Sequence, residues 1–328
     1  MISPSTWAKA LAGMPKIDAD TWQRLDLFSK WLIATRSAVL VMTFTSAALA
    51  GLFAYKAQQF DFILWLVMTL GLCLAHATNN LLNDLTDHLK GVDKGNYFRT
   101  RYGVQPIESG LMSVKENLLY AAITGGLATL CAIYLWTVRG DTIITLTAIG
   151  AFFVLFYTWP LKYIGMGEPA VLLVWGPLMI GGGYYVLAGD INTEVIIAAT
   201  TYALAPTAVL FGKHIDKLDA DKNKGIKTLP VILGHELSRK SVMGLFALQY
   251  PLLIGLVLSG YFSAIVLLTL IAIPSLVRIN QYFSAPPPDE PPEELEKVWP
   301  LYYVAAAFWY TRRFGGILTV CLILDALI

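Results

Sequence analysis

The stretch that decides the fold runs from residue 61 to residue 93 and reads DFILWLVMTLGLCLAHATNNLLNDLTDHLKGVD. Its first two thirds are long and apolar enough to cross a bilayer. Asn80, Asn83 with Asp84, and Asp87 then recur at i, i+3/i+4 and i+7, so a helix presents them on one face. A carboxylate at membrane depth is costly and usually functional. The alternative is an ordinary solvated loop that begins one turn past a membrane helix.

The rest of the chain has the composition of a membrane protein. Of its 328 residues, 56% are hydrophobic and only 14% are charged, whereas a soluble domain carries about a quarter charged residues. The three cysteines lie inside apolar runs without metal-ligand or disulfide spacing. The chain is therefore predicted to be an all-α polytopic membrane protein with about nine spans, over residues 35–55, 61–82, 116–137, 142–160, 169–189, 193–213, 242–260, 262–279 and 299–328.

A second acidic cluster, Asp216-Lys217-Leu218-Asp219-Ala220-Asp221, follows the sixth predicted span as the first cluster follows the second. Two four-helix halves, each with one cluster, would face each other across a central cavity. We expect a single membrane domain over residues 1–328. Its predicted parts are an amphipathic interfacial helix within residues 1–34 and acid-bearing loops at residues 83–115 and 214–240.

Positive charge predicts the orientation. Most of the 24 lysines and arginines fall in the N-terminal segment and in the loops after even-numbered spans. Positive charge is enriched on the cytoplasmic side of membrane proteins. We therefore expect an integral protein of the cell membrane, with the N-terminus and both acidic loops in the cytoplasm.

The two clusters suggest a metal and a phosphate. Six nearby carboxylates would repel one another unless cations neutralised them: Asp84, Asp87, Asp93, Asp216, Asp219 and Asp221. Oxygen ligands of this kind suit Mg²⁺, which keeps phosphate oxygens among its partners. The neighbouring cations are natural phosphate contacts: Lys90, Arg99, Arg101, Lys162, Lys213 and Lys227. Together they predict a Mg²⁺–diphosphate site at the cytoplasmic mouth of an apolar cavity.

Two motifs resemble those of a known family. Asn83-Asp84-x-x-Asp87 and Asp221-x-x-x-Gly225-x-x-Thr228-Leu229-Pro230 are similar to the motifs of the UbiA superfamily of membrane prenyltransferases. Three further segments make the chain most similar to the menaquinone-pathway branch, the 1,4-dihydroxy-2-naphthoate prenyltransferases: Tyr157-x-x-Pro160-x-Lys162, Gly165-Met166-Gly167-Glu168 and Gly176-Pro177-Leu178.

The resemblance implies Mg²⁺-dependent transfer of a polyprenyl group from a prenyl diphosphate to an aromatic quinone precursor, with no nucleic acid and no obligatory protein partner. The implied metal and catalytic residues are Asp84, Asp87, Asp216, Asp219 and Asp221. The implied substrate-binding residues are Asn80, Asn83, Lys90, Asp93, Arg99, Arg101, Tyr157, Lys162, Lys213 and Lys227. Tyr157 could instead be an aromatic residue of the membrane interface.

The second motif departs from the resemblance. The naphthoate branch usually reads Asn-Asn-x-Arg-Asp-x-x-x-Asp, whereas this chain reads Lys213-His214-Ile215-Asp216-Lys217-Leu218-Asp219-Ala220-Asp221. The first acid comes one residue early, which rotates a helical side chain by about 100°. Either the helix is locally adjusted, or Asp219 and Asp221 carry the metal while Asp216 supports them.

Other readings stay open. His214 could touch the acceptor, and Glu168 could cap its helix or bind the acceptor. A UbiA-type enzyme with another acceptor is one alternative. An ion-coupled transporter is another, although transporters place ionisable groups near the bilayer midplane rather than at helix ends. The aspartate-rich motif of membrane phosphatidyltransferases is absent from the sequence.

Overall fold

The computed structural model describes residues 4–13, 15, 17–92, 105–296 and 298–328. This part of the chain is built from helices, and its only strand-like pairing is an isolated bridge between Ile164 and Lys227. Three predicted site residues, Asp93, Arg99 and Arg101, lie outside the described residues. The prediction of an all-α protein is confirmed.

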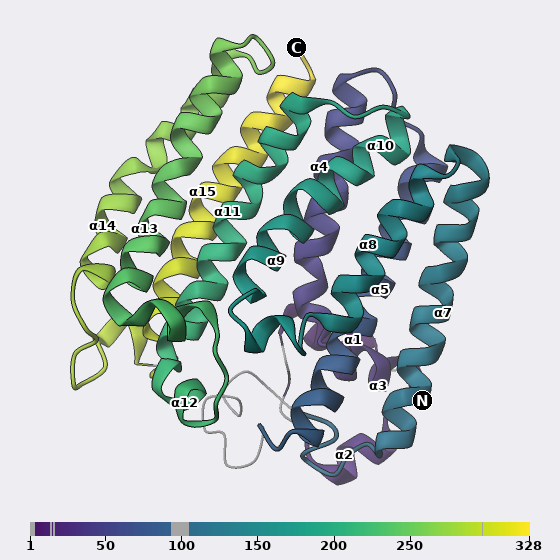
Figure 1. The fold of residues 1–328 in the computed structure, drawn as a ribbon, viewed down its shortest axis with the longest axis vertical. Helices are drawn as coiled ribbons and strands as arrows, with labels where there is room; N and C mark the ends of the chain where they lie inside the picture. The colour runs from purple at the N-terminus through teal and green to yellow at the C-terminus, as the bar shows by residue number, and fades with distance from the viewer. Residues whose placement is uncertain (1–3, 14, 16, 93–104, 297) are drawn as a thin grey trace. The chain divides into compact units, whose positions relative to one another are not determined.

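The chain divides into two compact units, Met1–Ala48 with Phe62–Trp159 and Leu49–Asp61 with Pro160–Ile328. The first unit holds α1 Pro4–Ala12, α2 Ala19–Arg24, α3 Leu27–Ala34, η1 Ser37–Val39, the first part of α4 Leu40–Lys56, α5 Phe62–Leu89, α7 Val114–Arg139 and α8 Thr142–Phe156. Asp84 and Asp87 of the first acidic cluster lie in this unit, near the end of α5, the helix labelled in Figure 1.

The second unit carries the second acidic cluster, on α11 and α12. Besides the end of α4, it holds η2 Leu161–Tyr163, α9 Gly167–Leu173, η3 Val174–Gly181, α10 Gly182–Ala188, α11 Thr193–Asp216, α12 Leu218–Asn223, α13 Leu229–Leu258, η4 Ala264–Ala272, α14 Ile273–Ser284, η5 Glu293–Leu295 and α15 Tyr302–Ala326. Each unit thus has one cluster, and the cavity between two halves stays a prediction.

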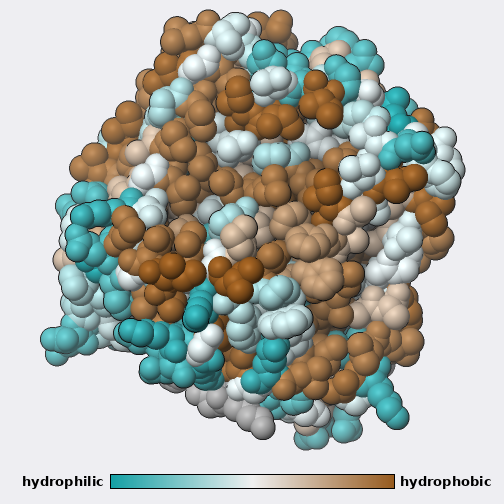
Figure 2. Space-filling model, viewed as in Figure 1, coloured by the Kyte–Doolittle hydropathy of each residue, from teal (hydrophilic) through white to brown (hydrophobic). Residues whose placement is uncertain are grey.

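Every predicted apolar run contains a helix. In the described part of the chain, seven helical segments are long and apolar enough to cross a membrane: Ser37–Lys56, Phe62–Leu89, Val114–Arg139, Gly167–Ala188, Thr193–Asp216, Leu229–Leu258 and Ala264–Ser284. The helix α8 is apolar but has only 15 residues, and α15 carries Arg312 and Arg313. Apolar residues cover much of the surface in Figure 2, as expected of helices that face lipid.

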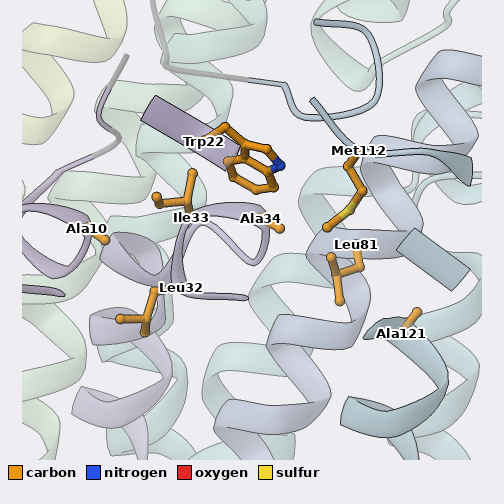
Figure 3. Packing of buried hydrophobic residues seen from close by; sticks show 8 residues of the cluster. All are labelled: Ala10, Trp22, Leu32, Ile33, Ala34, Leu81, Met112 and Ala121. Atoms are coloured by element: carbon orange, nitrogen blue, oxygen red, sulfur yellow. The ribbon is translucent and has the colours of Figure 1, made fainter. Parts of the chain in front are cut away.

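The N-terminal segment differs from the predicted single amphipathic helix. It forms α1, α2 and α3. Leu25 caps the end of α2, and Asp26 begins α3, where its carboxylate accepts from the Ser29 backbone N–H at 2.9 Å. Hydrogen bonds from Thr21 at the start of α2 hold the pKa of Asp18 below its usual value. The apolar side chains pack within the first unit, where Trp22 and Leu32 are buried with Leu81 of α5 (Figure 3).

In the second unit, α11 is the central helix and packs against α9, η3, α13 and α15. Glycines permit the close crossings, as is common between membrane helices. A Cβ on Gly176 of η3 would lie 2.8 Å from the carbonyl oxygen of Ala199, and one on Gly212 would lie 2.9 Å from that of Tyr303. A backbone oxygen cannot move away from such a Cβ as a flexible side chain can, so glycine allows η3 and α15 to pack closely against α11.

The end of α4 is tied to the end of α15 inside the same unit. Lys56 Nζ lies 2.5 Å from Asp325 Oδ2 and 2.6 Å from the carbonyl oxygen of Tyr261. The other carboxylate oxygen of Asp325 accepts from the backbone N–H of Ser263 at 2.6 Å. An acid in the last turn of a helix opposes the helix dipole, and Lys56 compensates it.

Candidate active site

The first acidic motif lies on the last turns of α5. Asn80, Asp84 and Asp87 are all buried, with exposed fractions of 8%, 2% and 0%. All three are buried, as expected if they lie on one face of the helix, and Asn83 is half-buried. Buried carboxylates require compensating charge or hydrogen bonds, so this motif is not a solvated loop.

The compensating charge on Asp84 comes from Arg36, a residue that the sequence analysis did not select. Arg36 Nη2 lies 2.7 Å from Asp84 Oδ1. Arg36 precedes the first long apolar helix and stood out only as one of several N-terminal basic residues. The contact joins residues that are 48 positions apart, which no local pattern encodes.

Two asparagine side chains are oriented by the same unit. Asn80 Nδ2 donates to the carbonyl oxygen of Thr35 at 2.8 Å, and Asn83 Nδ2 donates to Thr158 Oγ1 at 2.9 Å. In each case the amide nitrogen is the donor, which fixes the direction of the amide oxygen. The motif is thus positioned by the α3–η1 turn on one side and by the end of α8 on the other.

Basic and aromatic residues surround the end of α5. Lys90 Nζ lies 4.9 Å from the centre of the Trp159 ring, within the range of a cation–π contact. His88 Nδ1 lies 2.7 Å from Glu108 Oε2, so His88 has a partner rather than being a free loop residue. Tyr157 is the half-buried residue that ends α8.

The second motif contains a break in the helix. The helix α11 ends at Asp216, Lys217 has φ −118° and ψ 19°, and α12 then begins at Leu218. Both oxygens of Asp216 accept backbone N–H groups from the first turn of α15: Tyr303 N at 2.7 Å and Val304 N at 3.0 Å. Asp216 therefore caps α15 from another helix, using donors that a helix start leaves unsatisfied.

The other two acids of this motif differ in burial. Asp221 is 3% exposed, and Lys217 Nζ lies 3.0 Å from its carboxylate oxygens. The Asp219 side chain is 79% exposed and lies 3.5 Å from His235 Nε2. Gly225, with φ +71°, turns the chain after α12, and the backbone N–H of Ile226 returns to the carbonyl of Asp221. This turn holds Asp221 in place.

Three predicted lysines lie in the same unit. Lys162 is buried in η2, Lys213 is half-buried in α11, and Lys227 is exposed. The bridge between Ile164 and Lys227 brings the segment after Lys162 beside the segment after Gly225. Gly165 has φ +79°, a backbone conformation that favours glycine. Two motif segments distant in sequence are thus adjacent.

Glu168 and His214 form a buried pair. Glu168 Oε1 lies 2.5 Å from His214 Nδ1, and the side chains are 1% and 3% exposed. The second oxygen, Oε2, is buried and has no hydrogen-bond partner among the residues that the structure describes. Glu168 lies in the first turn of α9, and its carboxylate ties α9 to His214 in the last turn of α11.

Replacing Glu168 by alanine is expected to destabilise the protein, because it leaves a buried imidazole nitrogen without its partner. Such a loss costs about 1–3 kcal/mol. The unfolding temperature of the detergent-solubilised protein should fall. The control is Glu236→Ala, which removes an exposed carboxylate 2.6 Å from Lys240 and should cost under about 1 kcal/mol. Equal effects of the two substitutions would contradict a stabilising role for the buried pair.

The donor set fits a hard divalent cation. Asp84 and Asp87 of the first unit present buried carboxylate oxygens from one helix face. Within the described residues, no group of three or more His, Cys, Asp or Glu side chains could hold a metal ion. Mg²⁺ is commonly bound through one or two carboxylates with water and phosphate oxygens, rather than by an all-protein cage.

Together, the membrane-length helices and the aspartate motif in each unit define an integral membrane protein whose polar chemistry lies at helix ends. A family model described as the UbiA prenyltransferase family matches residues 44–293. The chain belongs to this family, and it is a prenyltransferase.

Curated relatives of two kinds are about equally similar. The UbiA prenyltransferase domain-containing protein 1 of Danio rerio is 27% identical over 268 residues, covering 79% of this chain and 78% of the relative. The 1,4-dihydroxy-2-naphthoate octaprenyltransferase of Escherichia coli (strain K12) is 28% identical over 229 residues, covering 67% and 73%. The family resemblance is confirmed, but these values do not single out the naphthoate branch.

Solved structures share the fold. One, from a study of digeranylgeranylglyceryl phosphate synthase, superposes with a TM-score of 0.60 at 17% identity and covers 92% of this chain and 98% of its own. A UbiA homolog from Archaeoglobus fulgidus bound to GPP and Mg²⁺ superposes with a TM-score of 0.56 at 16% identity, covering 86% and 99%.

Proposed function

We propose that the protein transfers a polyprenyl group from a prenyl diphosphate to an aromatic acceptor of the 1,4-dihydroxy-2-naphthoate type, with Mg²⁺ as cofactor. The observation that carries this proposal is the buried pair of carboxylates, Asp84 and Asp87, at the end of the membrane helix α5. Buried acids on one helix face fit a metal–diphosphate head group, and the exposed apolar surface fits a lipid environment for the substrate tail.

The comparisons supply support for both substrates. Family members of this fold have been solved with Mg²⁺ and GPP or with Mg²⁺ and DMAPP. Relatives from Escherichia coli and Bacillus subtilis are 1,4-dihydroxy-2-naphthoate octaprenyltransferases. Bound at the aspartates, Mg²⁺ would stabilise the negative charge of the departing diphosphate.

In the proposed reaction the bond between prenyl C1 and the diphosphate oxygen breaks, and its electron pair leaves with the diphosphate. A carbon of the electron-rich acceptor then forms a bond to C1 and loses its proton. Asp84 and Asp87 would hold the metal that accompanies the diphosphate, and Asp221 is the buried acid of the second unit that we assign to the same role. Lys162 and Lys217 add positive charge in the second unit. A cation that is already held in position stabilises the negative charge that develops on the departing diphosphate.

The orientation of the site is part of the proposal. The positive-inside distribution puts the N-terminus and both acidic motifs in the cytoplasm. A soluble aromatic acceptor would then meet the head group of a membrane-held prenyl diphosphate on that side. The two sides can be tested with single cysteines introduced at exposed Asp219 and at exposed Gln58, which comes shortly after the last residue of α4. Their reaction with a membrane-impermeant thiol reagent would report which side each residue faces.

The test of the proposal is product formation by the purified protein in nanodiscs. Prenyl diphosphates of increasing length are incubated with Mg²⁺ and a panel of acceptors, and products are identified by mass. Prenylated dihydroxynaphthoate should form, should disappear with EDTA and should return on addition of Mg²⁺. Products formed only from a different acceptor would overturn the acceptor assignment. Failure of every acceptor and every diphosphate to react would overturn the proposed reaction.

A further inference from the structure

Arg36 has a backbone conformation that does not suit its residue type. It has φ +53° and ψ +50°, and it directly follows Thr35, which ends α3. Its backbone N–H donates to the carbonyl of Ile33 at 3.0 Å. Glycine is the usual residue at this left-handed position after a helix, since it carries no Cβ penalty. Because the backbone alone would favour glycine, the arginine side chain gives the reason for the residue.

The N-terminal helices hold this turn in place. Ser37 Oγ donates to the carbonyl of Ala10 at 3.2 Å, and Trp7 Nε1 donates to Ser29 Oγ at 3.0 Å. Trp31 Nε1 donates to Thr124 Oγ1 of α7 at 2.9 Å. In Figure 3, Ile33 and Ala34 of the same turn lie among the buried residues of this cluster. These contacts therefore position the guanidinium of Arg36 beside α5.

The guanidinium forms an ion pair with a carboxylate of the proposed metal site. Arg36 Nη2 is 2.7 Å from Asp84 Oδ1, and Asp84 is 2% exposed. Arginine stays charged at any pH the enzyme meets. A divalent cation that binds this carboxylate must approach a fixed positive charge, and two cations repel strongly in a site shielded from water. A diphosphate anion bound in the same site would attract both cations, so the net interaction would become favourable to metal binding.

We propose that Arg36 is a built-in counter-cation of the first acidic motif, which weakens divalent-metal binding to the substrate-free enzyme and makes tight binding depend on the diphosphate. The inference rests on the proposed function, since it assumes that Asp84 and Asp87 hold the metal. Arg36 acts as a positioning residue that balances the negative charge of the motif before substrate binds. It thereby couples the arrival of the two substrate components, the metal and the prenyl diphosphate.

The test measures Mn²⁺ binding to the intact protein by the loss of the free-ion EPR signal. Wild type, Arg36→Met and Arg36→Gly are compared, with Arg24→Met as a control for loss of an exposed arginine on α2. Without diphosphate, both Arg36 variants should bind Mn²⁺ about tenfold or more tightly than wild type, because a repelling charge is gone. With an unreactive prenyl thiolodiphosphate present, wild-type affinity should rise to meet or exceed that of the variants.

The outcomes separate the inference from the proposed function. Mn²⁺ binding that Asp87→Asn abolishes but that Arg36→Met leaves unchanged or weakens would overturn the inference alone. Absence of Mn²⁺ binding in wild type and in both Arg36 variants would overturn the inference together with the metal assignment. Arg36→Gly keeps the test decisive if Arg36→Met does not fold, since glycine suits the left-handed turn. Thermal unfolding confirms that each variant tested is folded.

Discussion

Substitution of Asp87 by asparagine is expected to abolish prenyl transfer while the protein remains folded. Asp87 is fully buried on the face of α5 that also carries Asp84. Asparagine keeps nearly the same volume but removes the negative charge that a metal–diphosphate complex requires. Metal assistance to a leaving group is worth several kcal/mol, and each factor of ten in rate corresponds to about 1.4 kcal/mol. We therefore expect kcat/KM to fall by about 10²–10⁴-fold.

The measurement is the initial rate of product formation at saturating Mg²⁺, with circular dichroism and size-exclusion chromatography to verify folding. Asp289→Asn is the matched control, because it makes the same chemical change in the exposed proline-rich loop of residues 285–292. It should leave the rate unchanged. Near-normal activity of Asp87→Asn would remove Asp87 from the proposed metal site.

The second large effect concerns the acids of the second motif, which should separate into different classes. Asp221→Asn is expected to reduce kcat/KM by about 10²-fold or more, because Asp221 is the buried acid of the motif that lies beside Lys217. Asp216→Asn is expected to lower the unfolding temperature, since a cap on a helix start contributes about 0.5–2 kcal/mol. Asp219, which is largely exposed, should tolerate the same change.

Activity and unfolding temperature of all three variants are measured side by side, with activity assayed well below the lowest unfolding temperature. Loss of activity in Asp216→Asn without loss of stability would assign that acid to the site after all. A large loss of activity in Asp219→Asn would mean that the exposed acid turns inward when substrate binds.

The helical periodicity of the sequence was enough to predict the buried face of the first motif, because α5 is regular through Asp87. It was not enough for the second motif, where the residue shift could mean either a helix adjustment or a change of ligands. The structure shows a break at Lys217. The residue just before the break, Asp216, caps α15, and sequence spacing carries no information about such a tertiary partner.

The same limit applies to Arg36 and to the pair of Glu168 and His214. Each contact joins residues about 45–50 positions apart in different elements of the fold and depends on packing that a one-dimensional pattern does not reveal. The break between α2 and α3 in the N-terminal segment is easier to predict from the sequence. Asp26 directly precedes the apolar pair Leu27-Phe28, and an aspartate in this position is a helix-start signal that separates α2 from α3.

The contacts of Asp216 also bear on how short a working version of this protein can be made. The family match covers residues 44–293. Tyr303 and Val304, whose backbone N–H groups Asp216 accepts, lie after that region, and Arg36 lies before it. A fragment trimmed to the matched region would leave Asp84 without its guanidinium and Asp216 with two unsatisfied oxygens. The segment that identifies the family is shorter than the segment that keeps its two motifs in place.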